Sequence, residues 1–83
     1  MTNEVIAARA LAGHRIHLRF KDGTEGVIEL EKFLEFRGVF AGLLDERVFA
    51  TMKLNAELGT VQWENGADLA PEVLYEWMDK RDA

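Results

Sequence analysis

The chain has 83 residues, of which 48 % are hydrophobic and 30 % are charged, with no cysteine and a net charge of −5 at pH 7. This length predicts one domain over residues 1–83, and the composition excludes wholesale disorder, disulfide crosslinks and metal sites built from thiolates. No run approaches the ~20 apolar residues that span a bilayer, and the first residues lack the pattern of a signal peptide, so we expect a cytoplasmic protein with no membrane contact.

The acidic excess lies entirely in the second half of the chain. Residues 1–40 carry six basic and six acidic side chains, whereas residues 41–83 carry four basic and nine acidic ones. Direct binding of nucleic acid is disfavoured, because phosphate contacts need clustered Lys and Arg. The acidic half suits a basic protein partner, although a modest acidic excess also serves to keep a small protein in solution.

Three strands are predicted in the first third of the chain. An apolar stretch at residues 5–11 forms the first, strict alternation over residues 15–20 indicates the second, and residues 24–30 form the third. We expect these strands to pair antiparallel, with one face of the sheet exposed to solvent.

Side chains alternate between the two faces of a strand, so the length of the loop between the second and third strands decides which residues of the third strand face the core. A two-residue loop at Asp22 and Gly23 would turn the carboxylate of Glu25 toward the core. A three-residue loop, residues 21–23, with Gly23 in the left-handed conformation avoids this burial. The resulting register sets two charge pairs on the outer face, Arg19 with Glu25 and Arg15 with Glu29. The residues expected on the buried face are Ile16, Leu18, Phe20 and Ile28.

Short helical turns are predicted after the third strand. Residues 31–36 suit one turn that ends at Gly38. Asp45 is a good N-cap for a second short helix over residues 46–51. The side chains expected to close one end of the core are Phe33, Phe36, Val39 and Phe40, together with Val48 or Phe49.

A second hairpin follows, between residues 52–56 and 61–64. A three-residue loop would oppose Lys53 to Trp63, so an even loop is preferred. Four residues, 57–60, fit better than two, since Leu58 tolerates a positive φ poorly. This choice places Leu54 beside Trp63 and Lys53 beside Glu64.

The last element is the clearest helix. Pro71 fits its first position, the pair Asn65 and Gly66 forms the turn before it, and Asp68 lies close enough to accept backbone N–H groups at its start. Its apolar stripe consists of Val73, Leu74, Trp77 and Met78. The predicted fold class is therefore α+β: an antiparallel sheet of about five strands in two hairpins, packed against a C-terminal helix, with short helical turns between.

Candidate metal ligands do not form a convincing set. His14 and His17 are three residues apart, so on a strand they point to opposite faces. Glu64, Asp68 and Glu72 surround one turn but lack the dense oxygen spacing of a calcium loop. We therefore expect no metal and no cofactor.

Catalytic groups are equally sparse. The chain contains neither Cys nor Ser, and no threonine adjoins a histidine in the sequence, so the usual activated nucleophiles are missing. The glycines are spread over separate turns and form no phosphate-binding loop. Trp63 and Trp77 are expected in the core, with a small ligand pocket between them as the alternative. The chain is not expected to be an enzyme.

Several motifs carry a family resemblance that spans Val5 to about Tyr75. They are Phe20-x-Asp22-Gly23, Phe49, Gly59-Thr60-Val61-x-Trp63, Asn65-Gly66-Ala67-Asp68-Leu69, Pro71-Glu72 and Leu74-Tyr75. The chain resembles the bacterial family called domain of unknown function 2442. The resemblance implies no catalytic activity and a small prokaryotic protein that is often encoded beside another small domain, in arrangements suggestive of toxin–antitoxin pairs. Some members add a helix-turn-helix domain that binds DNA, which this sequence lacks.

The preferred function is a non-catalytic protein-interaction module, antitoxin-like, with a basic partner encoded by an adjacent gene. The alternative is a ligand-sensing or regulatory domain with a pocket near Trp63 and Trp77, and a third hypothesis is a hydrolase or binding protein that uses the carboxylates of Glu64, Asp68 and Glu72. Self-association is left open. The candidate interaction residues are Glu64, Asp68, Glu72, Tyr75, Glu76 and Asp79.

Overall fold

A computed structural model describes residues 4–80 and confirms the α+β class, with six strands in this range rather than about five. In chain order the elements are β1 (Val5–Leu11), β2 (Arg15–Phe20), β3 (Glu25–Glu29), the 3-10 helices η1 (Leu30–Lys32) and η2 (Gly38–Leu44), the helix α1 (Glu46–Phe49), β4 (Lys53–Asn55), β5 (Thr60–Gln62), β6 (Asp68–Leu69) and the helix α2 (Pro71–Lys80). No helix among the described residues has both the length and the apolar composition needed to cross a membrane.

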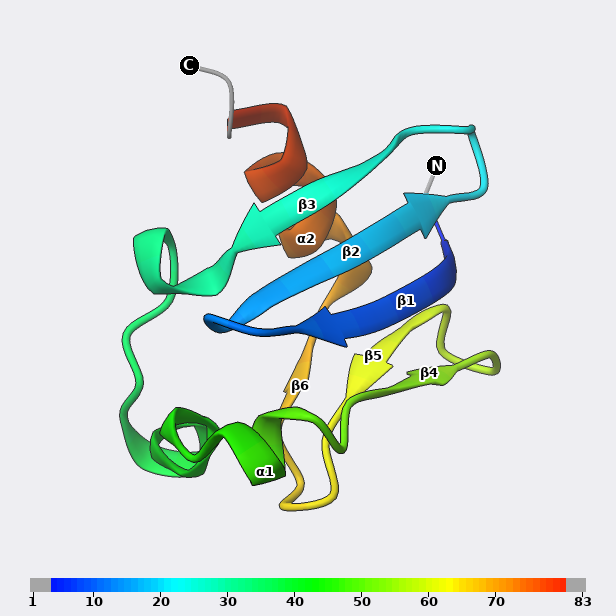
Figure 1. Ribbon diagram of the computed structural model, residues 1–83. Coiled ribbons are helices and arrows are strands. Elements are labelled where there is room, and N and C mark those ends of the chain that lie inside the picture. Colours follow the sequence, from blue (N-terminus) through cyan, green and yellow to red (C-terminus); the bar gives the residue numbers. More distant parts are fainter. Residues whose placement is uncertain (1–3, 81–83) are drawn as a thin grey trace.

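The strands form two three-stranded antiparallel sheets, β1-β2-β3 and β4-β5-β6, where the sequence predicted a single sheet. The sheets meet along β1, which lies beside the β4–β5 hairpin (Figure 1). The backbone N–H of Val5 donates to the carbonyl of Gly59 at 2.8 Å. Gly59 has a φ of +65°, and a Cβ there would lie 2.9 Å from Cγ of Glu4, so a larger residue would disturb this junction.

The register of β2 and β3 is as predicted. Arg19 lies opposite Glu25 and Ile16 lies opposite Ile28. The three-residue loop closes with Gly23 at a φ of +94°, so the predicted left-handed glycine is confirmed. All four side chains predicted for the buried face are fully buried: Ile16, Leu18, Phe20 and Ile28.

The expected charge pairs on the outer face of this sheet do not form, although the backbone register is right. Oε2 of Glu25 lies 2.9 Å from Nε2 of His17 instead of pairing with Arg19. Glu29 lies 3.7 Å from Nζ of Lys32, and Nε of Arg15 donates to the carbonyl of Ala12. Long charged side chains on a solvent-exposed face can pair with any of several neighbours, because each such ion pair is weak.

The second hairpin has the predicted loop length, but its register is shifted by two residues. Leu54 lies opposite Val61 and Lys53 lies opposite Gln62, so the predicted pairs of Leu54 with Trp63 and Lys53 with Glu64 are wrong. The loop occupies residues 56–59 because Asn55 closes it, with its carbonyl accepting from Gly59 N at 2.8 Å and its Oδ1 accepting from Leu58 N at 3.1 Å. As a result Leu54 is half-buried, not buried.

A short strand, β6, was not predicted. Trp63 N donates to Ala67 O at 2.9 Å and Gly66 N donates to Trp63 O at 3.1 Å, which closes a three-residue turn with Gly66 at a φ of +93°. The chain then returns antiparallel to β5, with Leu69 opposite Val61. Asp68 therefore lies in a strand with its side chain exposed, and the prediction that it caps the following helix is wrong.

The helical segments also differ in extent. The first turn, η1, begins at Leu30 and ends at Lys32, earlier than predicted. The prediction that Gly38 ends this turn is wrong, because Gly38 is the first residue of η2, which was not predicted. The N-cap of α1 is confirmed, because Oδ1 of Asp45 accepts from Arg47 N at 2.9 Å. This helix ends at Phe49, two residues before the predicted end.

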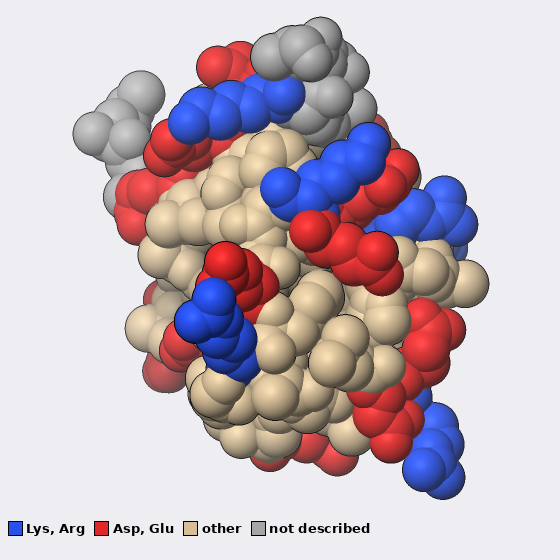
Figure 2. All heavy atoms as spheres, turned by 90° about the vertical axis from the view of Figure 1, so that its left-hand side faces the viewer, with Lys and Arg blue, Asp and Glu red and all other residues tan. Residues whose placement is uncertain are grey.

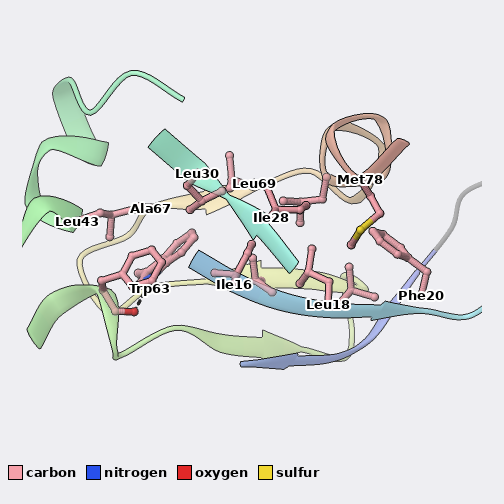
Figure 3. Packing of buried hydrophobic residues seen from close by; sticks show 14 residues of the cluster. Ile16, Leu18, Phe20, Ile28, Leu30, Leu43, Trp63, Ala67, Leu69 and Met78 are labelled. Carbon is pink, nitrogen blue, oxygen red and sulfur yellow. Dashed lines mark hydrogen bonds between the residues drawn. The ribbon is translucent and has the colours of Figure 1, made fainter. Parts of the chain in front are cut away.

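One hydrophobic core joins both sheets and α2 (Figure 3). Pro71 is the first residue of α2, as predicted, and Leu74 and Met78 are buried. Met78 extends toward Phe20, and Trp63 lies at the other end of the core (Figure 3). The apolar stripe is narrower than predicted, because Val73 is 36 % exposed and Trp77 is half-buried.

Candidate functional site

An apolar surface covers the side of the molecule formed by the segment from η1 to α1. Val39 is 49 % exposed and Leu44 is 56 % exposed, although Val39 was expected in the core. Figure 2 looks onto this side and shows areas of uncharged residues that are separated and bordered by clusters of acidic and basic side chains. We call the following residues the apolar face: Phe33, Leu34, Phe36, Val39, Phe40 and Leu44.

The short helical turns explain why these side chains stay at the surface. Backbone bonds hold the segment locally: the N–H groups of Phe33 and Leu34 donate to the carbonyl of Leu30, and Phe40 N donates to Arg37 O at 3.0 Å. Single turns of this kind direct few side chains inward. In η2 only Leu43 is fully buried, so the segment has more apolar side chains than the core accepts.

Charges near the apolar face are largely neutralised by their neighbours in the sequence. Three ion pairs occur along the segment, Glu29 with Lys32 at 3.7 Å, Glu35 with Arg37 at 2.7 Å and Asp45 with Arg47 at 3.4 Å. Because the members of each pair are exposed, they contribute little to stability. These three pairs carry no net charge between them, and the exposed carboxylates of Glu31 and Glu46, which contact His14, add negative charge to the same segment.

An aromatic stack connects the apolar face to α2. The rings of Phe33 and Trp77 lie with their centroids 5.5 Å apart and their planes 17° from parallel. Such offset stacks add to the stability that burial gives. The apolar face therefore continues onto one flank of α2, where Val73 is also partly exposed.

The outer side of α2 carries three of the predicted interaction residues. Glu72, Glu76 and Asp79 are exposed, and their spacing places them on the same side of the helix. Nζ of Lys80 lies 2.7 Å from Oε1 of Glu76, and this hydrogen bond lowers the pKa of the Glu76 carboxyl below its ordinary value. Within residues 4–80, no cationic side chain lies within 4 Å of Glu72 or Asp79.

The other two predicted acids lie elsewhere. Glu64 is in the turn between β5 and β6, which Figure 1 places at the opposite end of the molecule from α2. Asp68 lies in β6 opposite Gln62. The structure therefore groups three of the five acids on one helix and leaves Glu64 apart.

Tyr75, the predicted anchor, is turned toward the body of the protein. Its hydroxyl donates to Oδ2 of Asp22 at 2.8 Å and lies 3.4 Å from Oγ1 of Thr24. Its ring packs edge-on against Phe20, with centroids 5.0 Å apart. Tyr75 thus fastens α2 to the β2–β3 turn and is half-buried there.

The two tryptophans occupy separate aromatic contacts. Trp63 is buried, and its Nε1–H donates to the carbonyl of Phe49 at 2.9 Å. Trp77 instead stacks on Phe33. Each indole is already packed against a phenylalanine from another element.

The histidines are also separate. His17 contacts Glu25 on the outer face of β2, whereas His14, in the β1–β2 turn, contacts Glu31 and the carbonyl of Leu44. In the part of the chain that is described, no group of three His, Asp or Glu side chains is arranged to hold a metal ion.

The apolar face is the feature that sequence reasoning missed. The signal was present in the density of apolar residues between positions 33 and 44, but the sequence does not show how far they are exposed: Phe33, Phe36 and Phe40 pack against the core, as predicted, and are half-buried, whereas Val39 is exposed.

The comparisons with known proteins identify a family but no activity. The family model described as protein of unknown function (DUF2442) matches residues 5–80. Neither the curated proteins nor the solved structures gave a match.

Proposed function

The chain belongs to the DUF2442 family of proteins of unknown function, and since that assignment carries no activity, we propose from its surface that it is a protein-interaction module. The observation that carries the proposal is the apolar face, with Val39 and Leu44 about half exposed. The contact would centre on these two residues and the half-buried aromatic rings beside them.

The composition of this surface fits an interface. Contiguous exposed apolar side chains are uncommon on monomeric proteins and mark places where another molecule binds. Interfaces have an apolar centre rich in aromatic residues and a polar rim. The apolar face supplies the half-buried aromatic rings of Phe33, Phe36 and Phe40 together with the exposed Val39 and Leu44, and locally paired charges lie along the same segment.

The acidic side of α2 defines the chemistry of the partner. The stack of Phe33 on Trp77 places the apolar face next to this helix, which carries Glu72, Glu76 and Asp79. A partner with an apolar contact surface flanked by Lys or Arg would be complementary to both parts. Opposite charges of this kind mainly accelerate association and select among partners.

The gene arrangement implied by the family resemblance selects the first partner to test. Its members are often encoded beside another small domain, so we extend the proposal to an antitoxin-like role toward the product of the adjacent gene. This role requires no catalytic group, metal or cofactor. No contact of Trp63 or Trp77 favours the alternative of a ligand-sensing pocket.

The test is to co-express the chain with the product of the adjacent gene and to measure the affinity of the purified complex. Changing Val39 and Leu44 together to Ser should weaken binding at least about tenfold, while the free energy of unfolding stays within about 0.5 kcal/mol because both side chains are exposed. The matched control is Leu58→Ser, which alters a side chain that is 62 % exposed but lies in the β4–β5 loop, and it should leave the affinity unchanged.

Charge reversal tests the second part of the surface. Changing Glu72 and Glu76 to Lys should slow association at low salt and have little effect at high salt. The absence of a complex, or one that tolerates the Val39 and Leu44 substitutions, would refute the proposed binding surface. A complex that depends on Val39 and Leu44 but ignores the charge reversals would confine the contact to the apolar face.

A further inference from the structure

The side chain of His14 joins the two ends of the segment that carries the apolar face. His14 lies in the turn between β1 and β2, and its side chain is only 12 % exposed. Its Nδ1 is 3.1 Å from Oε1 of Glu31, in η1, and its Nε2 is 3.1 Å from the carbonyl oxygen of Leu44, the last residue of η2. One imidazole therefore connects the beginning of this segment to its end, and the backbone adds a bond from Leu30 N to His14 O at 3.1 Å.

Both ring nitrogens face groups that accept hydrogen bonds. The carbonyl of Leu44 has no hydrogen to donate, so Nε2 must carry the proton in that bond. A neutral ring with its proton on Nε2 would direct the lone pair of Nδ1 at the carboxylate of Glu31. Only the imidazolium, with a proton on each nitrogen, donates to both acceptors at once.

The other groups around the ring support the positive charge or are apolar. From α1, Oε1 of Glu46 lies 3.8 Å from Nδ1 and also accepts from Gly13 N at 3.2 Å. The only charged side chain adjoining from the same turn is Arg15, whose Nε donates to the carbonyl of Ala12. The segment η2 contains no charged residue, and Lys32 of η1 and Arg47 of α1 are paired with Glu29 and Asp45.

The ring also contacts the apolar face directly. The centroid of Phe36 lies 5.4 Å from that of His14, and the buried Phe49 lies 5.2 Å away on the core side. Phe36 belongs to the apolar face, so a shift of the imidazole is transmitted to that surface by contact.

We propose that His14 is a positioning residue that, as the imidazolium, holds the apolar face in its binding shape, and that loss of its proton loosens this segment. The role in binding rests on the proposed function, whereas the coupling between the proton and the segment is a property of the free protein. When the ring loses the proton on Nδ1, the bond to Glu31 is lost and the segment between Glu31 and Leu44 gains mobility.

The decisive measurement is an NMR pH titration of the free protein. The ring nitrogen signals of His14 report its protonation, and the backbone amide signals of residues 33–44 report the segment. We expect the chemical shifts of these amides to follow the protonation of His14. The protection factors of the hydrogen-bonded amides of Leu34, Phe40 and Asp45, which correct for the intrinsic rise of exchange with pH, should fall at least about tenfold once His14 is neutral.

Two variants separate the role of the proton from that of the side chain. His14→Asn keeps a residue that tolerates the φ of +55° at this position but does not titrate, and it should abolish the pH dependence of residues 33–44 and leave their amides in the fast-exchanging state. His17→Gln is the matched control, because His17 also contacts a carboxylate but lies on the outer face of β2, and the pH dependence should persist.

Amides of residues 33–44 that are indifferent to the protonation of His14, or that still follow pH in His14→Asn, would overturn the proposal. Neither outcome depends on a partner, so failure here is distinct from failure to form a complex with the adjacent gene product.

Discussion

Tyr75 illustrates how a single side chain holds a helix in place in this small protein. Its hydroxyl reaches Asp22, 53 positions earlier in the chain, and its ring lies against Phe20. The sequence predicts Tyr75 as an interaction residue; it is half-buried, and its hydroxyl is occupied by a contact within the protein. A tyrosine on a helix flank can serve packing and hydrogen bonding together, which sequence periodicity alone does not reveal.

Replacing Tyr75 with Phe should lower the free energy of unfolding by about 0.5 to 1.5 kcal/mol, because the hydrogen bond to Asp22 is lost while the ring contact with Phe20 remains. Urea denaturation measures this change. The affinity for the partner should be the same as that of the unchanged protein. Weaker binding with unaltered stability would instead place Tyr75 in the interface.

Asp45 gives the protein a predictable dependence on acid. The N–H of Arg47 donates to its carboxylate, followed in importance by the Arg47 side chain, and together they lower the pKa of Asp45 below its ordinary value of 3.8. The ionised carboxylate therefore stabilises the fold above pH 3.8, and this contribution is lost as pH falls through the lowered pKa.

In Asp45→Asn the cap remains but cannot titrate. The unchanged protein should be more stable than this variant near neutral pH, and the difference should shrink as pH falls below 3.8. Urea midpoints measured across this range test the expectation. A difference that stays constant down to strongly acidic pH would show that the charge of Asp45 does not contribute.

At the level of elements, one type of turn is used twice. In the β2–β3 turn, Phe20 N donates to Thr24 O, and in the β5–β6 turn Trp63 N donates to Ala67 O, each at 2.8 to 2.9 Å and each with a left-handed glycine in third place. The first turn could be predicted because residues on both sides alternate clearly. The sequence also predicts the second turn, at Asn65 and Gly66, but not the strand after it, because the two residues of β6, Asp68 and Leu69, are too few to show alternation.

The shifted register of β4 and β5 has a local cause. The alternation of side chains determines whether the number of residues in a loop is odd or even, and the predicted even number is confirmed. It cannot distinguish pairings that differ by two residues, since both keep the same faces together. The choice was made by Asn55, which closes the loop with its side chain and its carbonyl, and by Gly59, which takes the left-handed conformation.

Because only a narrow stripe of α2 is buried, substitutions at neighbouring positions of this helix should change the free energy of unfolding by very different amounts. Leu74→Ala should lower the free energy of unfolding by about 2 to 5 kcal/mol, since Leu74 is fully buried. Val73→Ala should change it by no more than about 0.5 kcal/mol, because Val73 is on the exposed flank of the same helix turn. Thermal melts of both variants test the docking of α2. Equal effects would mean that the helix packs through a different face.

At the level of the whole molecule, the two sheets share one hydrophobic core. Trp63 and Leu69 from the second sheet belong to the same cluster as Ile16 and Ile28 from the first. Val39, Leu44 and the acids of α2 are exposed and lie outside this cluster, so they can change without loss of the fold, whereas Phe33, Leu34, Phe36 and Phe40 pack against it. Sequence patterns predicted most of the shared core, whereas the exposure of the apolar face depends on how the segment from η1 to α1 crosses that core.

The shared core predicts a single cooperative unfolding transition. In Trp63→Phe, fluorescence reports Trp77 at the contact between α2 and Phe33, and in Trp77→Phe it reports Trp63 beside Phe49. Within each variant, the fluorescence midpoint in urea should coincide with the midpoint from far-UV circular dichroism. Separate midpoints would show that the two ends of the core unfold independently.

The position of α2 along the chain has a consequence during synthesis. Leu74 and Met78 cover a core whose first members, such as Phe20, leave the ribosome about 50 residues earlier. At a synthesis rate of about 5 to 20 residues per second, the core side of the first sheet remains exposed for roughly 3 to 10 seconds before α2 can pack on it. A nascent chain that stalls before Pro71 would expose a bare sheet, a natural target for a ribosome-bound chaperone.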